Sequence, residues 1–383
     1  MNPLLSDYQD ILNSLTDEGR LRCLHGESEE ALLDCTSNDY MAIGTDRGLR
    51  REFLRTLDEN AAFGSCASRL LYTSRDSYGE LEYFLASLFG REVLLFNSGY
   101  HANVGIITAL ALPGTLIVAD KLVHASAIDG IRLSGAPFRR FRHNDTDALE
   151  RILQKEAGDY RRVIVVVESV YSMDGDCAPL KEMAFLKERF GNMMLYVDEA
   201  HAFGVCGERG LGLSEQLGIV ADVDILVGTL SKAVASVGAF AVVGGVMKQY
   251  LVNSARSLIF STAIPPVSAM WSQFVIEKLV GMSDERRRLA EISGDVSQFF
   301  SELTGRVEQH STPIVPFMIG GNHEVLSAAE AMKRKGVLAL PIRRPTVAAG
   351  SERIRISLNA AMSDTDVASL KEAVAFAAKE VLK

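Results

Sequence analysis

Hydrophobic residues along the chain fall into short continuous runs separated by segments with helical character. The runs are typical of buried strands, and they cover residues 93–96, 115–119, 163–167, 195–197, 225–229 and 238–243. Segments such as 145–156 and 179–189 lie between them and are expected to be helices. Strand and helix alternate from about residue 91 to residue 245, which predicts a mostly parallel α/β sheet.

The pattern changes near the Pro265-Pro266 pair. An apolar run at 258–262 predicts one more strand before it, and a long helix is expected over 267–304. Strands at 314–319 and 353–358 then mix with helices at 323–335 and 364–381, which predicts an α+β arrangement. We therefore expect an N-terminal arm over 1–45, a large α/β domain over 46–265 and a smaller C-terminal α+β domain over 266–383.

Composition excludes several classes of protein. The chain has 383 residues, 48% hydrophobic and 23% charged, which is ordinary for a soluble globular protein. A net charge of −9 gives no reason to expect nucleic-acid binding, and no segment is expected to span a membrane. The five scattered cysteines form no CxxC pair, which favours reduced thiols and a cytoplasmic location. No HExxH motif is present, and no metal site is expected.

Ionisable groups follow two of the predicted strands. Asp198 comes directly after the run at 195–197, with His201 three residues further on, and Ser231 and Lys232 come after the run at 225–229. Open α/β sheets bind ligands at the carboxyl ends of their strands. Lys232 has small neighbours, and a partly buried lysine of this kind can form a Schiff base. Taken singly, such a lysine is more often a solvated charge, and such an aspartate more often a cap or an ion-pair member.

Together these groups fit one cofactor, pyridoxal phosphate. Its aldehyde needs an amine, which Lys232 supplies, and its pyridine nitrogen needs a carboxylate, which Asp198 supplies. Its phosphate needs N–H donors at a helix start, and the turn Ser98-Gly99-Tyr100 offers them, with Thr229 and Ser231 as hydroxyl partners. His124, at another helix entry, can stack on the ring.

Ordered motifs along nearly the whole chain carry a family resemblance. They are SNDY (37–40), SGYHAN (98–103), HASAIDG (124–130), RHND (142–145), ESVYSMDGD (168–176), VDEAHAFGVCGERG (197–210), GTLSK (228–232), FSTAIPP (260–266) and RIRISL (353–358). In these motifs the chain resembles the α-oxoamine synthases. The resemblance implies fold type I, the aspartate-aminotransferase-like fold of pyridoxal-phosphate enzymes. It has a mostly parallel central sheet with helices on both faces and a smaller C-terminal α+β domain.

The resemblance also implies roles for single residues at the cofactor ring. Lys232 is expected to form the Schiff base and later to move the substrate's α-proton. Asp198 is expected to bind the pyridine nitrogen and His201 the phenolic oxygen. His124 is expected to stack on the ring face, and Ser172 to lie beside the phenolic oxygen.

Further implied roles concern the phosphate and the substrate. The amides of Gly99 and Tyr100, with Thr229, are expected to hold the phosphate, and Thr262 is expected to reach the phosphate of a partner subunit. Asn38, His124, Arg343 and Arg355 are expected to meet the substrate, because a guanidinium fork suits a carboxylate.

The reaction that the resemblance implies condenses an amino acid with an acyl thioester and releases CO2. The resemblance also implies a homodimer in which both chains contribute to each active site. In its length, its SGYHAN turn and its tail RPTVAAGSERIRISL (344–358), the chain most resembles the members of the family that use L-alanine. This resemblance implies a pimeloyl thioester as the second substrate, carried on CoA or on an acyl carrier protein. Glycine with acetyl-CoA is the main alternative. Serine with a palmitoyl thioester and 5-aminolevulinate synthesis are more remote.

Two hypotheses from other classes of protein are alternatives to this enzyme. A non-catalytic partner subunit of such an enzyme would lack the Schiff-base lysine, whereas Lys232 is present. A dinucleotide-binding protein would carry a GxGxxG sequence after a strand, and no strand here is followed by one. Both therefore rank below the enzyme hypothesis.

Overall fold

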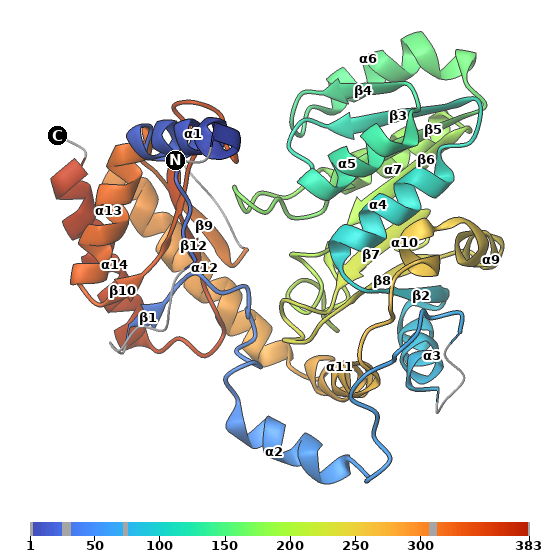
Figure 1. Cartoon of the computed structure of the whole chain (residues 1–383), viewed down its shortest axis with the longest axis horizontal. Coiled ribbons are helices and arrows are strands. Elements are labelled where there is room, and N and C mark those ends of the chain that lie inside the picture. Colours follow the sequence, from blue (N-terminus) through green and yellow to red (C-terminus); the bar gives the residue numbers. More distant parts are fainter. Residues whose placement is uncertain (1–2, 25–31, 72–75, 306–311, 382–383) are drawn as a thin grey trace. The chain divides into compact units, whose positions relative to one another are not determined.

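The computed structural model describes residues 3–24, 32–71, 76–305 and 312–381 (Figure 1). The chain forms two compact units. The larger unit comprises Met41–Ser172 and Asp176–Arg286, and the smaller comprises Met1–Tyr40, Met173–Gly175 and Arg287–Lys383. The three-part domain division expected from the sequence stays a prediction.

A seven-stranded sheet forms the centre of the larger unit. In spatial order its strands are β2 (Glu92–Phe96), β8 (Ala239–Val243), β7 (Ile225–Thr229), β6 (Met193–Asp198), β5 (Arg162–Glu168), β3 (Thr115–Asp120) and β4 (Phe138–Phe141). The pairs from β7 to β4 are parallel, and β8 runs antiparallel to both of its neighbours. The sequence-based prediction of a mostly parallel sheet is confirmed.

Helices cover this sheet because its central strands are apolar on both faces. The helices of the larger unit are α2 (Arg47–Thr56), which packs through Phe53 on α11, then α3 (Ser77–Phe89), α4 (Gly99–Leu110), α5 (Ala125–Ser134), α6 (Thr146–Glu156), α7 (Leu180–Arg189), α8 (Leu213–Gln216), α9 (Gly245–Ser254), α10 (Arg256–Ile259) and α11 (Pro266–Leu279), with a 3-10 turn, η2 (Ala157–Asp159). Side chains of α4, α5, α9 and α10 pack with one face of the strands into a continuous core. This packing fixes the helix starts that follow β2 and β3.

The smaller unit has its own sheet. Strands β11 (Leu340–Ile342), β12 (Arg353–Ser357) and β9 (Ile314–Met318) form an antiparallel sheet in that order, and β1 (Leu33–Asp34) pairs in parallel with β10 (Val337–Leu338). Its helices are α1 (Ser6–Asp17), α12 (Ser283–Thr304), α13 (Asn322–Arg334) and α14 (Asp364–Val381), with the 3-10 turn η1 (Pro3–Leu5). A mixed α+β arrangement was expected here and is confirmed.

Two predicted elements were wrong. The run 258–262 is not a strand: α10 ends at Ile259, and Phe260 N donates to the Arg256 carbonyl at 3.0 Å. A short apolar run cannot distinguish a buried helical turn from a strand. The helix expected over 267–304 is two helices, α11 and α12, separated by a turn in which Gly281 N donates to the Lys278 carbonyl at 3.0 Å.

No helix in the described ranges combines the length and the apolar character needed to cross a membrane.

Candidate active site

The predicted lysine and aspartate lie at neighbouring strand ends. Asp198 is the last residue of β6, and Lys232 follows β7, its parallel neighbour. Lys232 Nζ lies 2.9 Å from Nε2 of His201, in the turn after β6. The fold therefore gathers an amine, an imidazole and a carboxylate at one edge of the sheet, where α/β folds bind ligands.

Asp198 is held by two nitrogen donors. It is buried, and its Oδ2 accepts a hydrogen bond from Nδ2 of Asn103 at 2.7 Å. Its Oδ1 accepts from the amide of Ala200 at 3.0 Å. Both oxygens thus act as acceptors, which suits a carboxylate that binds a protonated ring nitrogen.

His124 begins α5. Its side chain caps the helix, because Nδ1 accepts a hydrogen bond from the amide of Ser126 at 3.2 Å. The Ser126 hydroxyl lies 2.7 Å from the same nitrogen. Desolvation of the ring and the charge of Lys232 lower the pKa of His124, although Asp198 opposes the shift. A neutral imidazole suits the expected stacking of His124 on an aromatic ring.

The start of α4 meets the end of β7. Ser98 caps α4, and its Oγ accepts from the amide of His101 at 3.2 Å. The first amides of a helix have no partner within the helix, which leaves those of Gly99 and Tyr100 directed outward. A Cβ placed on Gly99 would lie 4.0 Å from Thr229, whose Oγ1 is 2.9 Å from the Ser231 hydroxyl.

These groups form a cradle of amide and hydroxyl donors. The dipole of α4 adds partial positive charge at the same point, so the cradle suits a phosphate. The phenol of Tyr100 is used elsewhere, since its hydroxyl donates to Asp129 at 2.6 Å.

Ser172 was expected beside the phenolic oxygen of the ring, and Thr262 at the phosphate of a partner subunit. Ser172 donates its amide to Oε2 of Glu168 at 3.2 Å. Burial and the nearby charge of Asp198 raise the pKa of Glu168 to about 8. Thr262 is exposed, and its carbonyl accepts from Nδ2 of Asn97. Thr262 was expected to act on a partner subunit, which the single chain does not test.

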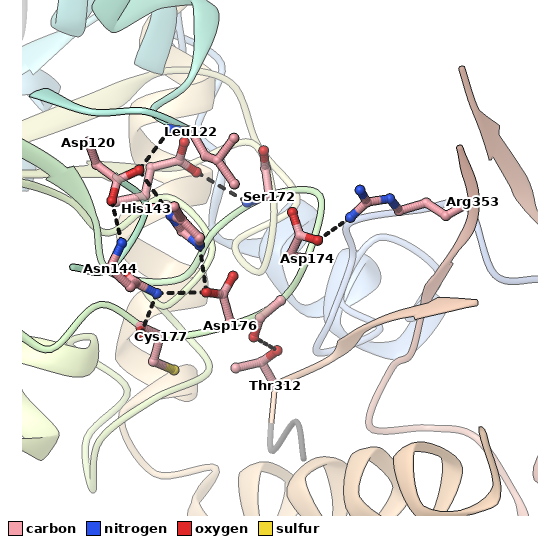
Figure 2. A network of polar contacts seen from close by, with 12 residues as sticks. Asp120, Leu122, His143, Asn144, Ser172, Asp174, Asp176, Cys177, Thr312 and Arg353 are labelled. Carbon is pink, nitrogen blue, oxygen red and sulfur yellow. Dashed lines mark hydrogen bonds and ion pairs between the residues drawn. The ribbon is translucent and has the colours of Figure 1, made fainter. Parts of the chain in front are cut away.

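A charged network fixes the segment that carries Ser172 (Figure 2). His143 lies between two carboxylates, with Nδ1 2.9 Å from Asp120 and Nε2 2.7 Å from Asp176. The amide of Asn144 donates to Asp120, and its Nδ2 donates to Asp176. Although burial opposes the shift, the hydrogen bonds to the two carboxylates raise the pKa of His143 to about 10, so it is an imidazolium at neutral pH.

Three of the four expected substrate residues, Asn38, Arg343 and Arg355, lie in the smaller unit, and His124 lies in the larger one. Nη2 of Arg355 donates to Oδ1 of Asn38 at 3.0 Å and to the hydroxyl of Tyr40 at 3.2 Å. Nη1 of Arg343 instead donates to the backbone carbonyls of residues 19 and 21, at 2.7 and 3.2 Å. The fold thus brings Asn38 and Arg355 together and uses Arg343 to hold the N-terminal segment.

Sequence reasoning missed four residues of the site. Asn103, Ser126, Tyr196 and Glu168 are buried and surround the expected ring contacts. Asn103 lies inside the SGYHAN motif and Glu168 opens ESVYSMDGD, so the motifs contained a signal that was not used. Ser126 lies inside HASAIDG in the same way. Tyr196 lies outside the motifs and has no such signal, because only the fold places it beside Asn103.

Comparison with known proteins identifies the family. A model of the family described as aminotransferase class I and II matches residues 36–374. A protein of Pasteurella multocida named "putative 8-amino-7-oxononanoate synthase" is 49% identical over 341 residues, which cover 88% of each chain. The chain belongs to the α-oxoamine synthases of this family. It is therefore an acyltransferase enzyme, as expected from its motifs.

Solved α-oxoamine synthases share the fold. A serine palmitoyltransferase of S. paucimobilis, solved with a bound aldimine of PLP and myriocin, has a TM-score of 0.89 at 26% identity, covering 99% of this chain and 98% of that one. The 8-amino-7-oxononanoate synthase of Francisella tularensis has a TM-score of 0.76 at 26% identity, covering 92% and 99%. The predicted fold type I is confirmed.

The residues of this α-oxoamine synthase fit pyridoxal phosphate. Lys232 offers an amine beside His201, and Asp198 offers a carboxylate whose oxygens are both acceptors. The amides at the start of α4 and the hydroxyl of Thr229 offer a phosphate cradle at the same edge of the sheet.

Proposed function

We propose that this α-oxoamine synthase joins L-alanine to a pimeloyl thioester, with release of CO2 and the free thiol, to give 8-amino-7-oxononanoate for biotin biosynthesis. The observation that carries the proposal is the 49% identity to the relative named "putative 8-amino-7-oxononanoate synthase". The site also fits pyridoxal phosphate, since it places the Lys232 amine beside His201. Pyridoxal phosphate is the proposed cofactor.

The proposed cofactor supplies one kind of chemistry, which is to stabilise negative charge on the amino acid's α-carbon. Lys232 would hold the cofactor covalently and then accept the α-proton at Nζ. His201, 2.9 Å from that atom, would orient it and bind the phenolic oxygen. Asp198 would keep the ring nitrogen protonated, and His124 would cover the ring face.

Binding of the phosphate is proposed for the cradle at the start of α4. The amides of Gly99 and Tyr100 and the hydroxyls of Ser98, Thr229 and Ser231 would donate to its oxygens. Ser172 would lie beside the phenolic oxygen. In a homodimer, Thr262 of one chain would reach the phosphate of the other, and the exposure of Thr262 is consistent with this role.

The substrate carboxylate is proposed to bind the group formed by Asn38, Tyr40 and Arg355. Arg355 is 3% exposed, and a buried guanidinium next to two polar side chains is suited to a carboxylate. Arg343 is kept as a second candidate for a carboxylate, although its Nη1 already donates to two carbonyls. A cytoplasmic location is also proposed, in line with five free cysteines.

Two alternatives concern the substrates only. The similarity to a serine palmitoyltransferase, with a TM-score of 0.89, favours serine and a palmitoyl thioester as the second candidate. Glycine with acetyl-CoA, the reaction of glycine C-acetyltransferase (2-amino-3-ketobutyrate CoA ligase), is the third. All three would draw on the proposed site residues, and they differ in the amino acid and the acyl chain.

A thiol-release assay tests the proposal. Alanine, glycine and serine are each combined with acetyl-CoA, pimeloyl-CoA, palmitoyl-CoA and a pimeloyl carrier protein, and kcat/KM is measured for each pair. Alanine with one of the pimeloyl donors is expected to exceed every other pair by about tenfold or more. A preference for glycine with acetyl-CoA, or for serine with palmitoyl-CoA, would contradict the proposed substrates.

A further inference from the structure

Behind Asp198 and His124 lies a buried chain of hydrogen bonds centred on Asn103. Nδ2 of Asn103 contacts Oδ2 of Asp198 at 2.7 Å and Oγ of Ser126 at 2.9 Å. Its Oδ1 accepts from the hydroxyl of Tyr196 at 2.7 Å. Asn103 is 1% exposed, and Ser126 and Tyr196 are fully buried. All five residues belong to the larger unit, and Asn103, Ser126 and Tyr196 had no expected role in the reaction.

The orientation of the Asn103 amide follows from its partners. The phenol of Tyr196 stays protonated, because burial raises its pKa well above the usual value, so it donates to Oδ1. Nδ2 must then face Asp198 and Ser126, and its two protons are both used. A flipped amide would place its oxygen 2.7 Å from a carboxylate oxygen, where two acceptors repel.

The same chain fixes the tautomer of His124. The Ser126 amide donates to Nδ1 of His124 at 3.2 Å, a long hydrogen bond that favours an acceptor at this nitrogen. Ser126 Oγ already accepts a proton from Asn103, which leaves its own proton to donate to Nδ1 at 2.7 Å. Nδ1 therefore carries no proton, and a neutral His124 carries its proton on Nε2.

We propose that Asn103 is a positioning residue that holds Asp198 as a hydrogen-bond acceptor and His124 as its Nε2-protonated tautomer. The proposal rests on the proposed function, because it assigns those two side chains to opposite tasks at one cofactor ring. The one amide of Asn103 then orients both side chains. Asp198 faces the ring nitrogen as an anion, and His124 is a neutral imidazole with an N–H donor at Nε2.

Neutral His124 agrees with the lowered pKa of this residue, to which desolvation contributes most. With the Asn103 amide in place, Asp198 keeps two donors, one on each oxygen. Removal of Asn103 would leave Oδ2 without its donor and would free Ser126 Oγ to rotate. A single substitution would therefore disturb both the Asp198 carboxylate and the His124 ring.

Three variants separate the two paths of hydrogen bonds that start at Asn103. Asn103→Ala removes the path to Asp198 and the path through Ser126 to His124, whereas Ser126→Ala removes only the second. Asn192→Ala is the matched control. Asn192 also donates two hydrogen bonds through Nδ2, to the carbonyls of Ala157 and Tyr160 at 2.9 and 3.0 Å. It lies outside the proposed site, so its loss costs a comparable pair of bonds with no link to the cofactor.

Two measurements are made on the purified full-length protein. The first is the dissociation constant of pyridoxal phosphate from the apoenzyme, together with the absorbance spectrum of the bound form. The second is NMR of protein labelled with 13C-histidine, which reports the tautomer of each ring; the His124 signal is identified by its loss in His124→Asn.

Asn103→Ala is expected to weaken cofactor binding about tenfold, the effect of one charge-assisted hydrogen bond, and to change the absorbance spectrum. Its His124 signal is expected to shift toward a mixture of tautomers. Ser126→Ala is expected to change the His124 signal but to keep cofactor binding within about threefold of the wild type. Asn192→Ala is expected to match the wild type in both measurements.

If Asn103→Ala does not fold, Asn103→Asp decides the question, because it keeps the shape and replaces the donor facing Asp198 by an oxygen. Its cofactor binding is expected to fall by more than tenfold. Wild-type cofactor affinity, spectrum and His124 tautomer in the folded variant would overturn the role of Asn103. A wild-type protein that binds no pyridoxal phosphate would instead overturn the proposed function.

Discussion

At the scale of single residues, the site combines groups whose sequence signal is strong with groups that have little or none. Asp198 and Lys232 follow apolar runs, so their positions at strand ends could be predicted from the sequence. Asn103 could be found only inside a motif, because an asparagine on an apolar helix face is usually a capping or packing residue. Its contacts with Asp198 and Ser126 arise only when α4, β6 and α5 come together.

Asp198→Asn tests the carboxylate at this scale. A neutral amide cannot hold a protonated ring nitrogen by charge, so we expect kcat/KM to fall by about a hundredfold or more. The matched control is Asp224→Asn. Asp224 also accepts a backbone amide, that of Leu195 at 2.7 Å, but it precedes β7 and lies outside the proposed site. Unchanged turnover in Asp198→Asn would remove this residue from the reaction.

At the scale of elements, the strands that carry the site were predictable and the peripheral ones were not. The continuous apolar runs gave β5, β6 and β7 within a few residues. Strand β4 was missed, because its sequence Phe-Arg-Arg-Phe has only two apolar residues and it lies at the edge of the sheet. The strand expected at 258–262 was wrong because its first two residues end α10 and, of the five, only Leu258 is buried.

Packing against β8 makes a sharp prediction for β7. A Cβ on Gly228 would lie 2.3 Å from the Phe240 ring on β8, so Gly228→Ala must displace that ring or the strand. We expect a loss of about 2 kcal/mol in the free energy of unfolding, measured by urea denaturation. Gly158→Ala is the control, since a Cβ there meets no atom within 4 Å. Equal stability of the two variants would contradict the close packing of β7 on β8.

The His143 network predicts a pH dependence of stability. The pKa of His143 is raised to about 10 by Asp120 and Asp176, above the usual 6.5, so its bound proton stabilises the folded state. This contribution is complete below pH 6.5, declines above it and is lost above about pH 10. His143→Gln should therefore destabilise the protein by about 1–3 kcal/mol at pH 6 and by much less at pH 10.

The measurement is the unfolding free energy of wild type and variant at both pH values. His323→Gln is the control, because Nε2 of His323 lies 3.0 Å from the Asp17 carbonyl rather than between two carboxylates. If His143→Gln lowers the free energy of unfolding as much at pH 10 as at pH 6, the charge of His143 does not stabilise the folded state.

At the scale of the whole molecule, the motifs are spread along nearly the full chain, and this is why the sequence alone indicates the family. The substrate pair could not be derived in the same way. Under the proposed function, alanine, glycine and serine would all meet the same amine, carboxylate and phosphate cradle, so these residues do not distinguish among the three candidate reactions.

The predicted homodimer belongs to this scale. If Thr262 acts on the phosphate of a partner subunit, activity requires two chains. Sedimentation velocity combined with activity measured over a dilution series should show a dimer whose dissociation abolishes turnover. Thr262→Ala should weaken cofactor binding without changing the sedimentation coefficient. A fully active monomer would contradict the shared site.

The covalent bond between Lys232 and the cofactor is the central claim, and borohydride reduction tests it most directly. The protein is reduced in the presence of pyridoxal phosphate, digested and examined by mass spectrometry, with Lys232→Ala treated in parallel. The account predicts a phosphopyridoxyl mass on the peptide that contains residue 232, and its absence in the variant. A label on another lysine that is equal in both proteins, or no label at all, would contradict the account.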